Sequence, residues 1–339
     1  MGEGNTPLVS SRQVGARVGL HNLFFKLESC NPSGSYKDRF VAAQMQAVLD
    51  MGVDGCIATS SGNTGASLAA YSARCGLACS IVVNDEAPAG KLQQMRAHGA
   101  RVMRVRDFIT SPTVTAEVYT RLSELSDDMS IPLIVSAYRH CPVGMAGVET
   151  IAYELGSQCR TRIDHVFVPI GGGGLFTAVC RGFRRRGGPL PRIHGVQPEG
   201  CLTVVAAYLR GDDEIRPIRS TTRISGLAVP FDIDAGMALA EMRALNGVGI
   251  AIRDEEVHRA QQLMLTEEGI WAEPAGAAAL AGAFRAAQEG IVAASDVVIC
   301  IVTGHGFKDP ASVADAAERH PVESVECTQL TREAFEVRA

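Results

Sequence analysis

Lys37 follows a turn rich in proline, glycine and serine and stands at the start of a stretch with helical character (residues 31–39, NPSGSYKDR). Such a turn lets the backbone approach a ligand closely. A lysine that is packed there against a flat ring loses its hydration, becomes a nucleophile and can form a Schiff base with an aldehyde. The alternative is a plain turn followed by a surface lysine that pairs with Asp38, since most lysines are solvated.

A second candidate site is the loop at residues 60–65 (SSGNTG), which lies between an apolar run and an alanine-rich stretch. Backbone N–H groups and the positive end of a helix dipole meet at such a place and favour an anion such as a carboxylate. We expect this carboxylate site to include Ser61, Gly62, Asn63, Thr64 and Gly65, and the Asn63 amide could also hold a phenolic oxygen. Simple N-capping by Ser61 or Asn63 is the alternative, but a cap needs only one such residue.

Four consecutive glycines, Gly171, Gly172, Gly173 and Gly174, form a third loop between an apolar run and a helical stretch. Each glycine forced into regular structure costs on the order of 1 kcal/mol of backbone entropy. Backbone N–H groups that wrap a phosphate explain the run better than a tight turn, which needs only one or two glycines. The loop is neither GxGxxG nor a Walker sequence, because no GK[ST] follows it.

Thr303 begins a fourth loop (residues 303–310, TGHGFKDP) after a strongly apolar run. A hydroxyl at the C-terminal end of a strand points into the crevice where open α/β sheets bind ligands. We interpret His305 and Asp309 as residues that shape this loop rather than as a catalytic pair. The four loops together supply a lysine for an aldehyde, a cradle for its phosphate, a helix terminus for a carboxylate and a hydroxyl for a ring nitrogen. Pyridoxal phosphate with an amino-acid substrate satisfies all four.

Short β-branched runs alternate along the chain with longer alanine-rich stretches, which indicates parallel strands joined by right-handed helical crossovers. The expected strands are residues 55–60, 79–83, 101–105, 165–169, 192–197 and 297–302, most of them apolar on both faces. The expected helices are residues 38–52, 65–75, 89–98, 112–126, 147–159, 175–185, 233–245, 254–268 and 275–289. Pro132 and residues 139–144 mark a possible seam between domains.

The composition is that of an α/β enzyme with enough apolar material for a large core, since 46% of the 339 residues are apolar and 20% are charged. A net charge of −5 argues against a nucleic acid or an anionic membrane as a partner. Ten cysteines without a CxxC pair point to a reducing cytoplasm. Eight histidines show no HExxH or similar spacing, so no metal site is expected.

Five motifs together resemble one family, the fold-type II pyridoxal phosphate enzymes of the threonine synthase and threonine dehydratase group. Residues 2–8 (GEGNTPL) are similar to the family's opening GEGNTPL, residues 31–39 to NPTGSFKDR and residues 60–66 to SSGNTGA. Residues 268–275 (EGIWAEPA) are similar to EGIFAEPxS, and residues 303–310 to the TGHGxKDP of threonine synthases. Each motif alone is weak, but their combination is specific to the family.

The resemblance implies an α/β fold of two open, mostly parallel twisted sheets flanked by helices, similar to the tryptophan synthase β fold, with the active site between two domains. It implies a large cofactor-binding domain made of residues 1–37 and 141–339. Residues 38–140 would form a smaller domain that closes over the substrate. A small amino acid as the substrate and a homodimer as the assembly are also implied.

Carried over residue by residue, the resemblance makes Lys37 the Schiff-base lysine and Asn63 the partner of the ring hydroxyl of pyridoxal 5'-phosphate. Residues 171–174 would hold the cofactor phosphate, and Thr303 would contact the pyridine nitrogen. A threonine, unlike an aspartate, cannot keep that nitrogen protonated, so the electron sink is moderate. Such a site suits elimination and replacement better than racemisation or transamination.

Two departures separate the chain from threonine synthases. Their Asn-Pro-Tyr-Arg segment has an arginine that helps to grip the substrate phosphate, and Gly144 stands at that position here. Their cofactor-phosphate loop usually carries asparagines, whereas four plain glycines look more like threonine dehydratases and serine racemases. Losing a phosphate clamp removes charge-assisted hydrogen bonds of about 1.5–3 kcal/mol each, so phosphohomoserine is not the expected substrate. Arg139 could grip an anionic side group from another direction, or it could simply be solvated.

The resulting expectation is a pyridoxal phosphate-dependent carbon–oxygen lyase that acts by elimination or replacement at Cβ or Cγ of a small amino acid. A threonine synthase-like and a serine or threonine dehydratase-like (ammonia-lyase) reaction both stay open. A pyridoxal phosphate-binding protein without catalysis is an alternative of a different class. A nicotinamide-dependent oxidoreductase is another, although only a glycine-rich turn supports it.

Overall fold

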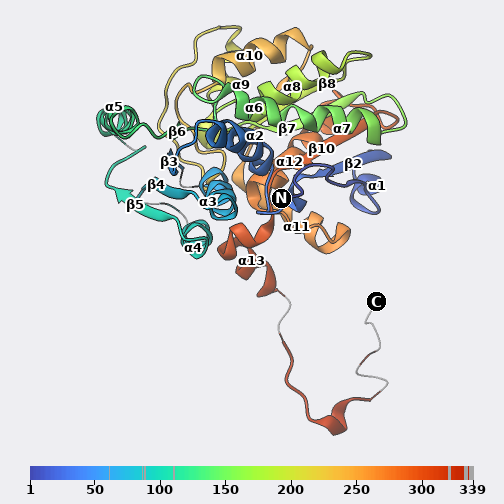
Figure 1. Cartoon of the computed structure of the whole chain (residues 1–339). Helices are drawn as coiled ribbons and strands as arrows, with labels where there is room; N and C mark the ends of the chain where they lie inside the picture. Colours follow the sequence, from blue (N-terminus) through green and yellow to red (C-terminus); the bar gives the residue numbers. More distant parts are fainter. Residues whose placement is uncertain are drawn as a thin grey trace.

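The computed structural model describes residues 1–60, 62–85, 87, 89–109, 111–319, 322–331 and 335. Within them the chain forms two sheets with helices on both sides (Figure 1). The parallel pairing that the alternating pattern indicates is present, and so are the two open, mostly parallel sheets that the family resemblance implies.

The larger sheet has the strand order β1-β2-β10-β7-β8-β9. Its strands are β1 (Leu8–Ser10), β2 (Asn22–Leu27), β7 (His165–Pro169), β8 (Arg192–Pro198), β9 (Gly249–Ile252) and β10 (Val297–Val302). All neighbouring pairs are parallel except β1 and β2, which are antiparallel. β7 and β10 are buried along their whole length, which explains why they read as continuous apolar runs.

Helices cover both faces of the larger sheet. On one face α12 (Pro274–Gln288) packs on the strands, with α11 (Asp254–Glu268) outside it and the short α1 (Val14–Arg17) beside α11. The other face carries α7 (Thr150–Gln158), α8 (Gly174–Arg186), α9 (Val204–Arg210) and α10 (Ala235–Ala244). The alanine-rich α12 has small side chains nearly throughout, so its backbone approaches the sheet closely.

The smaller sheet is entirely parallel, with the order β5-β4-β3-β6. Its strands are β3 (Gly55–Thr59), β4 (Ala78–Asn84), β5 (Arg101–Val105) and β6 (Leu133–Ile134). One face carries α3 (Asn63–Cys75) and α4 (Ala89–Ala97), and α5 (Pro112–Met129) packs near β6 (Figure 1). The expected closing domain of residues 38–140 includes all of this sheet, and its closure stays a prediction.

Two helices join the sheets into one body. α2 (Lys37–Asp50) packs against both α3 and α6 (Pro142–Val148), and a single apolar core runs from the smaller sheet through these helices to the larger one. α13 (Pro310–Ala317) follows the last strand, and residues 322–331 then lead away from the body (Figure 1).

Most of the elements that the sequence did not predict are short. They are β1, β2, β6, β9, α1, α6, α9 and α13, whereas the helix expected at residues 147–159 is present as α7. β1, β6 and β9 span only two to four residues, too few for a periodic pattern to be visible. α6 contains two glycines, which weaken a helical signal.

Candidate active site

A cavity of about 250 Å³ lies where strand ends from both sheets meet three helix N-termini. Its wall includes the last residues of β3 and β7 and the first residues of α2, α3 and α8. The carboxyl ends of parallel strands and the amino ends of the following helices share one edge of each sheet, so the crevice follows from the topology.

Most of the predicted site residues line this cavity. Those on its wall are Lys37, Gly62, Asn63, Thr64, Gly171, Gly172, Gly173, Gly174 and Thr303. Gly65 is not on the wall. A Cβ atom there would lie 2.6 Å from Cε of Met95 and 2.7 Å from the Ser60 carbonyl oxygen. Its glycine therefore serves close packing. Ser61 lies outside the described residues.

Lys37 is held beside Thr303 by backbone pairing between their two loops. Tyr36 N–H donates to the Thr303 carbonyl (3.1 Å), and His305 N–H donates to the Gly34 carbonyl (2.9 Å). Gly34 has φ +88° and packs on the Phe307 ring so closely that no Cβ would fit. The turn at residues 31–36 thus places Lys37 as the first residue of α2, with its Nζ 2.7 Å from Ser136 Oγ.

Asp38 does not pair with Lys37 as a plain surface turn would require. Its fully buried carboxylate accepts hydrogen bonds from Ser33 N (2.6 Å), Ser33 Oγ (2.5 Å) and Ser67 Oγ (2.5 Å). Burial raises the pKa of Asp38, although these three donors oppose the shift. Asp38 therefore ties the turn before Lys37 to α3.

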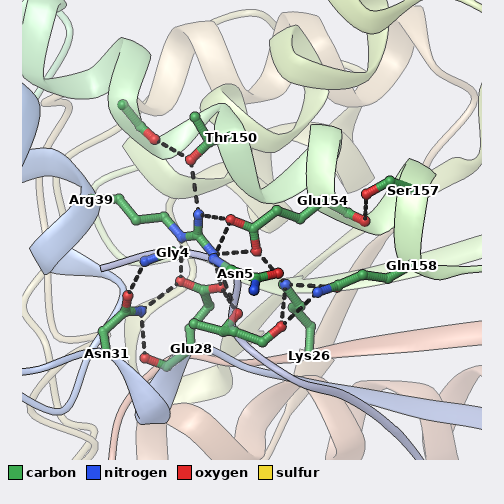
Figure 2. Close-up of polar contacts among 12 residues, drawn as sticks. Gly4, Asn5, Lys26, Glu28, Asn31, Arg39, Thr150, Glu154, Ser157 and Gln158 are labelled. Atoms are coloured by element: carbon green, nitrogen blue, oxygen red, sulfur yellow. Dashed lines mark hydrogen bonds and ion pairs between the residues drawn. The ribbon is translucent and has the colours of Figure 1, made fainter. Parts of the chain in front are cut away.

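A cluster of four charges, of which Lys26, Glu28 and Arg39 are buried and Glu154 is partly buried, fixes the first turn of α2 to the N-terminal segment (Figure 2). Arg39 donates to both oxygens of Glu28 (2.7 Å each) and to both oxygens of Glu154 (2.5 and 2.8 Å). Lys26 also donates to Glu154, at 2.5 Å. Burial by itself raises the pKa of Glu154, but the hydrogen bonds from Arg39 and Lys26 outweigh it and bring that pKa to about 2.

The glycine-rich opening of the chain closes this cluster. Asn5 N–H donates to Glu154 (2.7 Å), and Gly4 N–H donates to Asn31 Oδ1 (2.9 Å). Thr6 donates its hydroxyl to Glu28 (2.7 Å). The GEGNTPL motif is thus structural here, because it satisfies the carboxylates that orient α2 and Lys37.

The glycine loop forms a cradle in which Gly171 and Gly173 leave no room for a side chain. A Cβ at Gly173 (φ +97°) would lie 2.5 Å from the Asp234 carbonyl oxygen, and one at Gly171 would lie 2.9 Å from the Gly226 carbonyl oxygen. A Cβ at Gly174 would lie 2.9 Å from Cε of Met145. Since α8 begins at Gly174, the unpaired N–H groups of its first turn face the cavity together with the positive end of its dipole. The loop therefore fits a phosphate.

Asn63 shares its amide with a buried ion pair. Its Nδ2 donates to Glu273 Oε1 (2.5 Å), and its buried Oδ1 has no hydrogen-bond partner among the described residues. Glu273 also pairs with Lys91 (3.1 Å), which donates to Ser225 Oγ (3.2 Å). An unpaired buried acceptor on the wall of a cavity is a position where a ligand atom is expected.

Three residues of this wall, Ser136, Lys91 and Glu273, were not found from the sequence. Glu273 lies in the EGIWAEPA motif, for which the sequence by itself predicts no site role. Lys91 follows a glycine on α4, and Ser136 lies in an irregular segment after β6. No local pattern distinguishes the last two from ordinary surface residues.

Two arginine positions considered for anion binding lie away from the cavity wall. Arg139 pairs with Asp232 (2.8 Å) and is half exposed. At Gly144 a Cβ would lie 2.6 Å from Cε2 of Phe40, so this position faces α2. Among the described residues, the cations on the wall are Lys37 and Lys91.

His305 and Asp309 have the local roles that the sequence suggests. His305 Nδ1 accepts a hydrogen bond from Phe307 N–H (3.3 Å), and Asp309 caps α13 by accepting from Ser312 N–H (3.3 Å). Neither side chain contacts the other in these interactions.

The model of one protein family, described as "Pyridoxal-phosphate dependent enzyme", matches residues 1–304. The chain belongs to this family. Its cofactor is therefore pyridoxal 5'-phosphate, for which Lys37, the glycine cradle and the Asn63 amide are chemically suited donors and acceptors.

Comparison with individual relatives shows which members of the family the chain is similar to. It is 33% identical to the threonine synthase of Methanocaldococcus jannaschii, over 96% of this chain and 80% of that protein. It is 31% identical to the threonine synthase of Methanosarcina acetivorans, over 94% and 79%. Among solved structures it is similar to maize serine racemase (TM-score 0.78, 26% identity, 94% of this chain and 92% of that one). The enzyme is thus threonine synthase-like.

In the part of the chain that the structure describes, no three His, Cys, Asp or Glu side chains gather as a metal site would require. None of the helices among those residues is long and apolar enough to cross a membrane.

Proposed function

We propose that this enzyme catalyses elimination or replacement at Cβ or Cγ of a small amino acid, with Lys37 as the residue that binds the cofactor covalently and moves the α-proton. The main support for this proposal is that Lys37 lines the same cavity as the glycine cradle, the N-terminus of α3 and Thr303. Pyridoxal phosphate, when bound, withdraws electrons from the substrate's α-carbon and makes its proton acidic.

The roles of the other residues follow from their chemistry. The first-turn N–H groups of α8 and the loop of residues 171–174 would hold the cofactor phosphate. The N-terminus of α3, at Gly62, Asn63 and Thr64, would bind the substrate carboxylate. Thr303 would face the ring nitrogen with a neutral hydroxyl. A neutral partner supports prompt departure of a leaving group rather than a long-lived carbanion.

The placement of the cations in and near the cavity argues against O-phosphohomoserine as the substrate. Lys91 is engaged by Glu273, Arg139 is engaged by Asp232, and position 144 faces Phe40. A dianionic phosphate desolvated in such a site would lack a bidentate arginine partner. We therefore propose a substrate whose leaving group is neutral or singly charged.

A dehydratase-like reaction on serine or threonine is the second candidate. The observation that favours it is the cradle of plain glycines, in which Gly171 and Gly173 pack against backbone carbonyl oxygens and leave no room for an asparagine side chain. A hydroxyl leaving group would also need no anion clamp. Elimination would then release ammonia and a keto acid.

The assembly and compartment proposed from the sequence are a homodimer and the cytoplasm. The ten unbridged cysteine thiols support a reducing compartment. Light scattering coupled to size exclusion would measure the mass of the assembly.

The deciding experiment is to mix the purified holoenzyme separately with serine, threonine, O-phosphoserine and O-phosphohomoserine. Keto acid, ammonia and released phosphate would be quantified, with and without an added nucleophile. We expect turnover of serine or threonine, whose leaving group is an uncharged hydroxyl, and little turnover of O-phosphoserine or O-phosphohomoserine. Efficient conversion of O-phosphohomoserine to threonine would overturn the proposed substrate class.

Lys37→Ala is the matched control for this experiment. It should abolish turnover and covalent retention of the cofactor after borohydride treatment, measured by intact mass. Retained turnover in this variant would refute the role of Lys37.

A further inference from the structure

We propose that Ser136 is a positioning residue for the catalytic amine: its hydroxyl holds the ε-amino group of Lys37, and Asp234 holds the segment that carries Ser136. This inference rests on the proposed function, because it deepens the role assigned to Lys37. It concerns two residues that no sequence motif distinguishes.

The contact between Ser136 and Lys37 is direct. Lys37 Nζ donates to Ser136 Oγ at 2.7 Å, and Ser136 lines the same cavity. The other contact of the hydroxyl is a long one, 3.9 Å to Sδ of Met145. Whenever Lys37 carries an uncombined amine, this geometry engages one of its N–H bonds and orients the nitrogen lone pair.

Asp234, which directly precedes α10, fixes the segment around Ser136. Its fully buried carboxylate accepts hydrogen bonds from Tyr138 N–H (2.7 Å) and, more weakly, from Arg139 N–H (3.4 Å). Burial raises the pKa of Asp234, and these two backbone donors oppose the shift. Tyr138 also donates its hydroxyl to Glu149 (2.8 Å), so the segment is held at two points.

The same aspartate contacts the phosphate cradle. Asp234 N–H donates to the Gly172 carbonyl (2.8 Å), and its own carbonyl packs against Gly173. One buried residue therefore connects the loop that would hold the cofactor phosphate with the hydroxyl that holds the amine. The distance between the phosphate site and the amine depends on both contacts.

Orientation matters here because a lysine side chain has four rotatable bonds, and reactions of a tethered amine depend steeply on its placement. One lost hydrogen bond of ordinary strength corresponds to about 1.4 kcal/mol, or tenfold in a rate. We therefore expect removal of the Ser136 hydroxyl to slow the reactions of the Lys37 amine about tenfold.

The test uses capture of pyridoxal phosphate by the cofactor-free protein, followed by stopped-flow absorbance of the bound cofactor. Ser136→Ala should capture about tenfold more slowly, whereas Ser136→Thr, which keeps the hydroxyl, should stay within about threefold of the wild type. Ser126→Ala is the remote control, because the Ser126 hydroxyl lies on α5 and donates to the Ile131 carbonyl just beyond that helix. Wild-type capture by Ser136→Ala would overturn the proposal.

A double-mutant cycle tests whether Asp234 acts through Ser136. Asp234→Asn keeps one acceptor oxygen and is the milder variant if Asp234→Ala fails to fold, which thermal melting would show. Asp234→Asn should slow capture of the cofactor relative to the wild type. When Asp234→Asn is added to Ser136→Ala, the further slowing should be smaller than the slowing that Asp234→Asn causes in the wild type. Fully multiplicative losses would mean that the two residues act independently and would refute the coupling.

The capture assay needs no amino-acid substrate, so it separates this inference from the proposed function. If Ser136→Ala captures the cofactor slowly but no amino acid undergoes elimination or replacement, the positioning role of Ser136 would be supported and the proposed function would be refuted. If turnover exists, α-deuterated substrate should give a larger isotope effect in Ser136→Ala than in the wild type. An unchanged isotope effect with unchanged capture would remove the inference alone.

Discussion

Replacing Glu154 by glutamine should destabilise the protein by about 3 kcal/mol at pH 7. Its pKa of about 2 lies well below the ordinary value of 4.5, and a difference of this size corresponds to about 3 kcal/mol of free energy of unfolding. The physical source is the pair of cations in Figure 2, Arg39 and Lys26, which would face only Glu28 in the variant.

The structure offers a matched control for this substitution. The side chains of Glu267 and Glu154 are equally exposed, at 18%. Their partners differ, because Arg17, which pairs with Glu267, is 59% exposed, whereas Arg39, which pairs with Glu154, is 2% exposed. Surface pairs of this kind contribute about 0–1 kcal/mol. Urea titrations would measure the free energy of unfolding of both variants, and Glu267→Gln should shift it by less than about 1 kcal/mol.

The pH dependence gives the second arm of the test. Because the folded pKa is depressed, the stabilisation from Glu154 is complete above about pH 5 and is lost as the pH falls toward 2. The difference between wild type and Glu154→Gln should thus be smaller at pH 4 than at pH 7, by about 1 kcal/mol. Equal effects of Glu154→Gln and Glu267→Gln, or a difference that grows toward pH 4, would refute the reasoning.

Two further variants test the cradle and a remote histidine pair. Gly173→Ala should weaken pyridoxal phosphate binding at least tenfold, because the residue has φ +97° and a Cβ would meet the Asp234 carbonyl at 2.5 Å; an unchanged affinity in equilibrium dialysis would contradict this. Burial, and then the neighbouring His165, lower the pKa of His194 to about 3, so the folded protein should lose about 1.4 kcal/mol per pH unit as the pH falls below about 6. His194→Asn, which can still accept from Val248 N–H, should show a flatter pH dependence in urea unfolding, and a slope identical to the wild type would exclude this role.

The sequence determined the local parts of this protein. A strand followed by glycines and a helix makes an N-terminus with exposed N–H groups wherever it occurs, so the loops at Asn63 and Gly171–Gly174 could be recognised by composition alone. Lys37 was recognisable because a Pro/Gly turn directly precedes it. The parallel sheets followed from apolar runs that alternate with helical stretches.

Only the tertiary structure decided which distant residues meet these loops. Ser136, Lys91 and Glu273 reach the cavity because strand crossovers and helix packing bring their segments together, and no spacing along the chain encodes that meeting. Arg139 illustrates the converse, since the nearby Asp232 binds it away from the cavity wall. Periodicity reports which face of an element is buried, whereas long-range partners depend on how whole elements pack, so the partner of the Lys37 amine became visible only in the folded chain.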